Sequence, residues 1–308
     1  MSPFAHESVL LGNPENSPIL QLLRPQPGDS AADLTLGLGG HAEAILERTA
    51  PDGILYGFDA DAENLSQATD RLSTFGSRFK AIHANFREIA SRLPEPVDIV
   101  LADLGLSSPH LDDPSRGFSF RTDAPLDMRF DRDAGEPLHA VIPTLNHREL
   151  TTILRDFGEV QDAHKIAGAI TDLTASAERP LTTFDVRSAV EGRVGHRAAS
   201  LLPQIFQAFR MFINDEIGAL ETMLRDTPAL LKPGGRWGII SFHSLEDRLV
   251  KNAFRALCTP ELDELTGQIR VPAAFEPLTK KPVVPDEKEV AENPRSRSAK
   301  FRAIRRVG

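Results

Sequence analysis

Residues 31–42, with the sequence AADLTLGLGGHA, constrain the fold of this chain more than any other stretch. Asp33 and Thr35 alternate with Leu34 and Leu36, which is the pattern of a short strand. Three of the next four residues are glycines, and the sequence AEAILERTA that follows has helical composition and spacing. A glycine turn between a strand and a helix lets the backbone approach a ligand and directs free helix N–H groups at it. The pattern indicates a nucleotide site, although a purely structural tight turn uses the same glycines.

The composition is that of a soluble globular protein. The 308 residues are 41% apolar and 26% charged, enough for one large domain or for two with one interrupting the other. No apolar run is long enough to cross a bilayer, and residues 1–18 lack the features of a secretion signal. The lone Cys258 cannot form an internal disulfide, which fits a reducing compartment. We therefore expect a cytoplasmic protein without a membrane partner.

Strand and helix patterns alternate over the first third of the chain. Further strands are predicted within 54–61, 78–86 and 97–105, with helical segments between them. This alternation predicts an α/β fold with a mostly parallel sheet, whose strands end at one ligand-binding edge. From 136 to 211 the spacing is helical, which indicates an all-helical domain inserted into the sheet.

The sheet pattern resumes after the helical stretch. We expect a turn at 232–235, a strand at 236–242 and a final edge strand at 299–307. The predicted domains are 1–110 (first part of the cofactor-binding domain), 111–212 (inserted helical substrate domain) and 213–308 (second part, with a basic C-terminal segment).

Two acidic residues stand where a nucleotide ligand would need them. Asp59 ends the second predicted strand 19 residues after Gly40, the place of an acid that binds ribose hydroxyls. It could instead cap the next helix, as Asp61 could equally well. Asp103 ends the fourth strand, and Phe86 follows the third, where it could flank an adenine. This pattern does not separate a dinucleotide from S-adenosylmethionine.

Longer motifs make the resemblance specific. DLTLGLGGHA, GFDAD, HANF, LADLGLSSPHLD, RGFSF, PLDMRFD, FQAFR, ISFHSLEDRLVK and ENPRSRSAKFR occur in this order between His6 and Arg302. Together they resemble the MraW/RsmH family, the bacterial 16S rRNA (cytosine-N4)-methyltransferases. The resemblance implies a class I methyltransferase (Rossmann-like) fold with an inserted helical domain. It also implies an S-adenosylmethionine-dependent enzyme that methylates the N4 amine of a decoding-site cytidine in the small ribosomal subunit.

The resemblance also assigns site residues. It implies that the cofactor is bound by Gly39, Gly40 and His41 at its methionine end, Asp59 at the ribose, Phe86 near the adenine, and Asp103 and His110. His110 stands where the family usually has glutamine, and Leu34 stands where a glycine is usual. Ser8 and the segment at 196–210 also depart from the family pattern, so the fit to substrate is less defined than the cofactor site.

Methyl transfer to an amine requires positioning and an acceptor that polarises the delocalised nitrogen. Our hypothesis is that Asp103, Ser107 or Ser108 polarises the amine. Phe118 or Phe120 could stack on an extruded base, or could equally well pack the loop. His243 could be catalytic, but a structural histidine at a strand end explains it more simply.

The remaining charged residues leave alternatives open. Aspartates and arginines interleaved over 112–133 are explained by ion pairs in an ordered loop, and we predict no metal site. The net charge of the chain is −9, and the candidate RNA contacts are Arg187, Arg193, Arg197, Arg210 and the basic C-terminal segment.

Two alternative functions stay open, a non-catalytic ribosome-binding protein and a nicotinamide-dependent oxidoreductase. The oligomeric state, monomer or homodimer, stays open.

Overall fold

The computed structural model describes residues 8–12 and 16–307. The chain forms two compact units, one made of residues 1–105 and 219–308 and the other of residues 106–218. We call them the sheet unit and the helical unit. His6, where the family resemblance begins, and most of the stretch inspected for a secretion signal lie outside the described residues.

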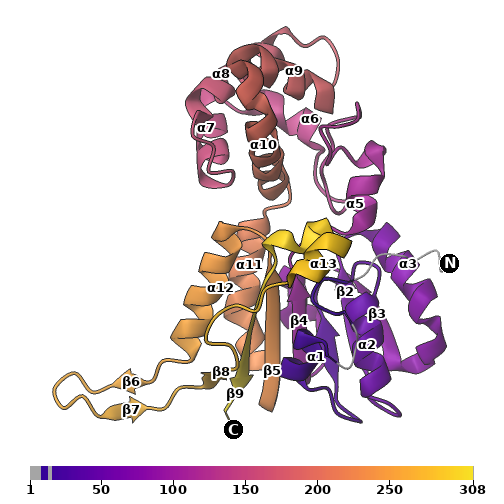
Figure 1. Ribbon diagram of the computed structural model, residues 1–308, viewed down its shortest axis with the longest axis vertical. Helices are drawn as coiled ribbons and strands as arrows, with labels where there is room; N and C mark the ends of the chain where they lie inside the picture. Colours follow the sequence, from indigo (N-terminus) through magenta and orange to yellow (C-terminus); the bar gives the residue numbers. More distant parts are fainter. Residues whose placement is uncertain (1–7, 13–15, 308) are drawn as a thin grey trace. The chain divides into compact units, whose positions relative to one another are not determined.

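A seven-stranded sheet in the order β3-β2-β1-β4-β5-β9-β8 forms the centre of the sheet unit (Figure 1). Strands β1 to β5 run parallel, whereas β9 is antiparallel to β5 and β8 is antiparallel to β9. The expected mostly parallel sheet is therefore present. Its strands are β1 (Ala31–Asp33), β2 (Leu55–Asp59), β3 (Phe79–His83), β4 (Val97–Asp103), β5 (Leu231–Ser241), β8 (Phe275–Pro277) and β9 (Lys300–Arg306).

Two predictions about the second half of the sheet were wrong. Residues 232–235 do not form a turn before the strand, because β5 already begins at Leu231. The pairing with β4 shifts between Val97 and Ile99, so that the Pro-Gly-Gly sequence is accommodated as an irregularity inside β5. The basic strand β9 is not an edge strand either, because it pairs with β5 on one side and β8 on the other.

Helices cover both faces of the sheet because its strands alternate apolar side chains between them. Ile99 and Leu101 of β4 face a core shared with α1, α2 and α3, whereas Val100 and Ala102 face a second core shared with α4, α11 and α12. The fully buried Trp237 lies in the second core. The helices of this unit are α1 (Pro18–Leu23), α2 (Gly40–Arg48), α3 (Ala62–Leu72), α4 (Ile89–Arg92), α11 (Glu216–Asp226, which begins in the helical unit), α12 (Ser244–Leu257) and α13 (Glu287–Glu292).

Residues 8–12, which we call the N-terminal segment, lie against two distant parts of the sheet unit. The N–H of Leu10 donates to Oε1 of Glu289 in α13 at 2.6 Å. Val9 and Leu10 are buried in the same core as α2. The segment is thus fixed by residues from both halves of the sheet unit.

The helical unit has a core of its own. Side chains such as Leu154, Ile166 and Phe209 are fully buried in it. Capping boxes begin two of its helices, with Asn146 and Glu149 at α7 and Thr182 and Asp185 at α9. Its helices are α5 (Ser108–Asp112), α6 (Leu138–Val141), α7 (His147–Asp156), α8 (Ala163–Ser176), α9 (Thr183–Val194) and α10 (Ala198–Ile213).

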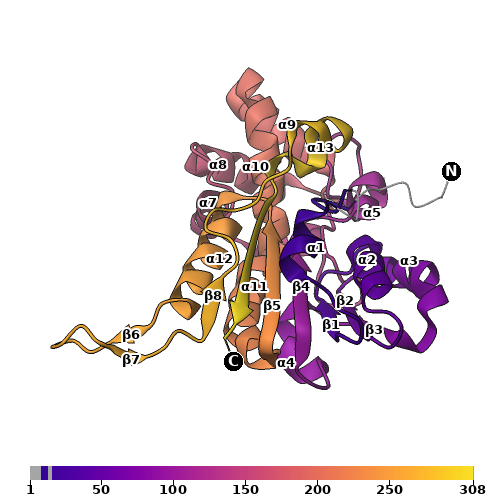
Figure 2. The same cartoon turned by 60° about the horizontal axis from the view of Figure 1, so that its bottom comes forward.

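A hairpin of β6 (Glu261–Leu262) and β7 (Ile269–Val271) projects from the sheet unit, as Figures 1 and 2 both show. Its tip carries Leu265, which is 96% exposed. The two strands pair antiparallel with each other and form a separate two-stranded sheet. In the part of the chain that is described, no helix is both long enough and apolar enough to cross a membrane.

Candidate active site

Three aspartates lie at one edge of the sheet. Asp33 ends β1, Asp59 ends β2 and Asp103 ends β4. β1 lies between β2 and β4, and the strand order reverses between β1 and β4. Ligands of open α/β sheets bind outside the carboxyl ends of the strands at such a reversal. The fold therefore gathers acidic groups where a ligand is expected.

The glycine turn after β1 is tied to the end of β2. The N–H of Gly37 donates to Oδ2 of Asp59 at 2.7 Å, and the N–H of Asp61 donates to Oδ1 at 2.8 Å. Gly37 and Gly39 have φ angles of 52° and 80°, which favour glycine, and Gly39 is the N-cap of α2. Burial raises the pKa of Asp59 to about 7. Both carboxylate oxygens are held in place, and each can accept a further hydrogen bond.

Asp33 is the most deeply buried of the three aspartates, at 1% exposure. Its Oδ1 accepts from the N–H of Thr35 at 3.2 Å, and its Oδ2 has no hydrogen-bond partner among the described residues. Burial raises the pKa of Asp33 to about 7. Sequence analysis missed this residue because it expected the strand to continue to Leu36. The available signal was a carboxylate at a strand end, the same as for Asp103.

Asp103 is connected to β1 through a threonine. Its N–H donates to Oγ1 of Thr35 at 2.5 Å, and its Oδ1 accepts from the N–H of Gly105 at 3.4 Å. Burial raises the pKa of Asp103 to about 6, and the carboxylate of Asp33 adds to this rise, whereas the imidazole of His41 opposes it. The edge therefore holds closely spaced carboxylates with little positive charge around them.

Gly40 and His41 lie beneath the N-terminal segment. Nε2 of His41 is 2.9 Å from the carbonyl oxygen of Val9 and donates to it, because a carbonyl can only accept. A Cβ at residue 40 would stand 2.1 Å from Oγ of Ser8, so glycine leaves room for this segment. The predicted cofactor contacts at 40 and 41 thus also hold the N-terminal segment.

Phe86 begins a short 3-10 turn directly after β3. Asn85 and Glu88 form a capping box around this turn. The ring is half-buried and packs against the core beneath α4. Because β3 neighbours β2, Phe86 lies at the same edge of the sheet as Asp59.

His243 and Glu246 form the start of α12, just beyond β5. Nδ1 of His243 accepts from the N–H of Glu246 at 3.4 Å, and Oε2 of Glu246 accepts from the N–H of Phe242 at 2.8 Å. Nε2 of His243 lies 2.9 Å from Oε1 of Glu246, but the angle between the two groups does not fit a hydrogen bond. This capping arrangement favours the structural interpretation of His243.

Ser107, Ser108 and His110 belong to the helical unit. Oγ of Ser107 and Nδ1 of His110 are 3.0 Å apart. The imidazole of His110 is 5% exposed and packs against the rings of Phe118 and Phe130, at centroid distances of 5.2 and 5.1 Å. Because Phe118 is itself buried in the core of this unit, the arrangement favours loop packing over base stacking for that ring.

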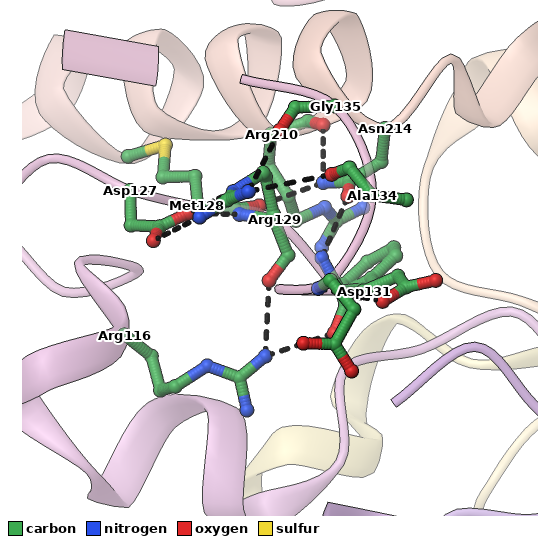
Figure 3. A network of polar contacts seen from close by, with 11 residues as sticks. Arg116, Asp127, Met128, Arg129, Asp131, Ala134, Gly135, Arg210 and Asn214 are labelled. Carbon is green, nitrogen blue, oxygen red and sulfur yellow. Dashed lines mark hydrogen bonds and ion pairs between the residues drawn. The ribbon is translucent and has the colours of Figure 1, made fainter. Parts of the chain in front are cut away.

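The loop rich in aspartate and arginine is ordered by a polar network (Figure 3). Asp127 forms an ion pair with Arg129 at 2.8 Å, as the interleaved charges predict. Arg116 is 2% exposed and donates to the carbonyl oxygens of residues 129 and 130. Asn214 donates to the carbonyl of Met128 at 2.8 Å and accepts from the N–H of Phe130 at 2.7 Å. These bonds hold Met128 at a φ of 63°, which is unusual for a residue with a side chain.

The basic residues selected on charge alone have acidic neighbours. Four of them form ion pairs: Arg187 with Glu191, Arg193 with Asp172, Arg197 with Asp162, and Arg210 with Glu216. In the C-terminal segment Lys300 and Arg302 share Asp247, and Arg305 pairs with Glu276. These charges are partly neutralised within the protein, which weakens the case for a basic surface built from them.

Comparison with known proteins decides what kind of site this is. A sequence model of the MraW methylase family matches residues 3–307. The chain belongs to the MraW methylase family. Ribosomal RNA small subunit methyltransferase H of Syntrophotalea carbinolica is 45% identical over 320 residues, covering 99% of this chain and 98% of the relative. The protein of the same name from Geobacter sp. strain M21 is 43% identical over 320 residues, covering 100% of both chains.

Family membership confirms the resemblance and the predicted fold class, a class I methyltransferase sheet with inserted helices. As a MraW methylase, the chain is an S-adenosylmethionine-dependent methyltransferase. The oxidoreductase alternative is therefore wrong. The aspartate edge fits this cofactor by charge. S-Adenosylmethionine carries positive sulfonium and ammonium groups. A positive group at this edge would stabilise the ionised forms of Asp33, whose Oδ2 has no hydrogen-bond partner among the described residues, and of Asp103, whose pKa is raised by burial.

Proposed function

We propose that this methyltransferase acts on the N4 amine of a decoding-site cytidine in the 16S rRNA of the small ribosomal subunit, in the cytoplasm. The observation that supports this most directly is the alignment of relatives named ribosomal RNA small subunit methyltransferase H along the whole chain. The departures at Leu34 and His110 lie within residues 3–307, which the family model matches. Leu34 is 1% exposed in the core, where it serves packing.

In this proposal the cofactor is held mainly by the edge of the sheet unit. Asp59 accepts hydrogen bonds from the ribose hydroxyls, and the ring of Phe86 packs near the adenine. Asp103 faces the positively charged methionine end, and we add Asp33 there because it ends the neighbouring strand β1. Gly39, Gly40 and His41 bring the first turn of α2 to the same end, and the family resemblance adds His110.

The proposed catalytic residues are Asp103, Ser107 and Ser108. S-Adenosylmethionine supplies the methyl group in electrophilic form on its sulfonium sulfur. The cytidine amine is a weak nucleophile because its lone pair is delocalised into the ring, and an acceptor at its N–H hydrogen localises that lone pair. Asp103 is suited to this role, because a carboxylate with a pKa of about 6 is ionised at neutral pH and yet more basic than in water. When the N–CH3 bond forms, the amine must lose one proton, and Asp103 accepts it.

The test is methyl transfer to small subunits from a strain that lacks the gene, with the cytidine analysed by mass spectrometry. We expect the wild-type protein to add one methyl group to N4 of a single cytidine. Asp103→Ala should lose methyl transfer even at S-adenosylmethionine concentrations that saturate the variant in calorimetry, which separates loss of the proton acceptor from weaker cofactor binding. Ser107→Ala and Ser108→Ala measure whether a hydroxyl shares the role.

Two outcomes would contradict this proposal. If wild-type protein binds the subunits and the cofactor but transfers no methyl group, the chain is a ribosome-binding protein that keeps the fold. If Asp103→Ala retains full activity, the proton acceptor lies elsewhere.

A further inference from the structure

The helical unit contains a concave pocket of about 480 Å³. It is formed by residues 120–121, the last turns of α9, the turn at 195–196 and the first turns of α10. Its volume lies within the roughly 300–1,000 Å³ of small-molecule sites. All of its lining residues belong to the helical unit, so the pocket is defined independently of the sheet unit.

The pocket combines an apolar interior with basic groups. Phe120 and the buried Leu202 line it, and Phe120 is braced by an edge contact with Phe206 at 5.4 Å between centroids. Arg121 and His196 also line it and are exposed. Among the described residues of the lining, the one acidic residue is Glu191, which is paired with Arg187, itself a lining residue. Single-stranded nucleic acids are bound by this combination, with bases on aromatic and apolar surfaces and phosphates on cations.

Arg121 differs from the arginines that sequence analysis selected. Its side chain, like that of His196, makes no hydrogen bond or ion pair with any residue in the described part of the chain. Arg187 also lines the pocket and is paired with Glu191, but this pair is exposed and therefore weak enough to open for a phosphate. The pocket thus offers Arg121, whose side chain has no polar partner among the described residues, and Arg187, which can leave its exposed ion pair for a phosphate.

We propose that this pocket binds one nucleotide of a single-stranded segment of the RNA substrate. The base contacts Phe120 and Leu202, and the phosphate contacts Arg121 and His196. This inference rests on the proposed function, because it takes RNA as the substrate. It adds a contact made by residues outside the proposed catalytic set of Asp103, Ser107 and Ser108, so we expect it to affect substrate affinity and not the chemical step.

The experiment compares Arg121→Ala with Arg148→Ala in the full-length protein. Arg148 is an exposed arginine on α7 of the same unit, outside the pocket, so its removal changes the net charge equally. Binding of a fluorescein-labelled single-stranded oligoribonucleotide of mixed sequence is measured by anisotropy at several salt concentrations. We expect about tenfold weaker binding for Arg121→Ala, the cost of one charged hydrogen bond. The slope of log affinity against log salt should become shallower by about 0.7, the value for one phosphate contact.

Further readouts separate this inference from the proposed function. With small subunits as substrate, Arg121→Ala should raise KM and leave kcat unchanged. Phe120→Leu keeps the pocket apolar but removes the ring, and should weaken oligonucleotide binding at least about fivefold. Wild-type affinity and salt slope in Arg121→Ala would overturn the pocket, as would an equal loss in Arg148→Ala. A wild-type protein that transfers no methyl group but binds RNA through Arg121 would instead overturn the proposed function.

Discussion

Replacing Asp33 by asparagine should change the stability of the cofactor-free protein in a way that depends on pH. The difference in free energy of unfolding between Asp33→Asn and wild type should be more favourable to the variant at pH 8 than at pH 5. Asp33 is 1% exposed, and its Oδ2 has no hydrogen-bond partner among the described residues. Burial raises the pKa of Asp33 from 3.8 to about 7 in the folded protein. Asparagine has nearly the same shape, keeps an oxygen for the N–H of Thr35, and carries no charge to desolvate.

The size of the effect follows from linkage. Because one pKa unit is worth 1.36 kcal/mol, the rise from 3.8 to about 7 corresponds to at most about 4 kcal/mol. Between these two pKa values the folded protein holds a proton that the unfolded chain has lost, so the free energy of unfolding falls as the pH rises. From pH 5 to pH 8 wild type should lose about 3 kcal/mol through this group, and Asp33→Asn should not.

The assay is urea denaturation at intervals from pH 5 to pH 8 without cofactor. The matched control is Asp98→Asn, because Lys232 at 2.8 Å and Ser30 lower the pKa of Asp98 below 3.8. Asp98 is ionised in both folded and unfolded protein across this range, so its replacement should destabilise by an amount that does not vary with pH. If the difference in free energy of unfolding between wild type and Asp33→Asn also stays constant from pH 5 to pH 8, the reasoning is refuted, because Asp33 would then ionise as it does in water.

Two further predictions concern other parts of the chain. Asn214→Ala removes the partners of the Met128 carbonyl and the Phe130 N–H, and should cost about 1–3 kcal/mol for each group left buried without a bond; a loss below about 0.5 kcal/mol in urea denaturation would contradict the role of this network. His243→Gln should keep the shape of the wild-type pH–rate profile and lose about 1 kcal/mol of stability, because His243 caps α12; a shifted limb of the profile would show that His243 transfers a proton.

The sequence predicts most of the sheet edge, because the change from an apolar strand pattern to polar residues locates the end of a strand approximately. Asp59 and Asp103 were selected as strand-end acids, and both lie at the carboxyl edge. Asp33 was missed because alternation continues past it to Leu36, whereas the chain leaves the sheet after three residues. Periodicity reports side-chain direction, but it does not report where backbone pairing stops.

Charge patterns predict the surface less well, because ion pairs form between residues that are distant in sequence. Arg197 pairs with Asp162, and Arg193 pairs with Asp172 in another helix. Arg121, which has no such partner in the described chain, lies among aspartates in the sequence and so was expected to be paired. The positions of β9 and β8 in the sheet could not be predicted from the sequence either, because the strand pattern of 299–307 does not show which strands pair with it.

The bond between Leu10 and Glu289 joins residues 279 positions apart. During synthesis, the N-terminal segment therefore leaves the ribosome long before its partner in α13 exists. Strands β1 to β4 can pair while translation continues. The N-terminal segment, which covers Gly40 and His41, can form its bond to Glu289 only when nearly the whole chain has emerged. Completion of this corner of the proposed cofactor site is thus coupled to completion of translation. A nascent chain that stops before α13 has the aspartate edge, but the segment that covers Gly40 and His41 lacks its bond to Glu289.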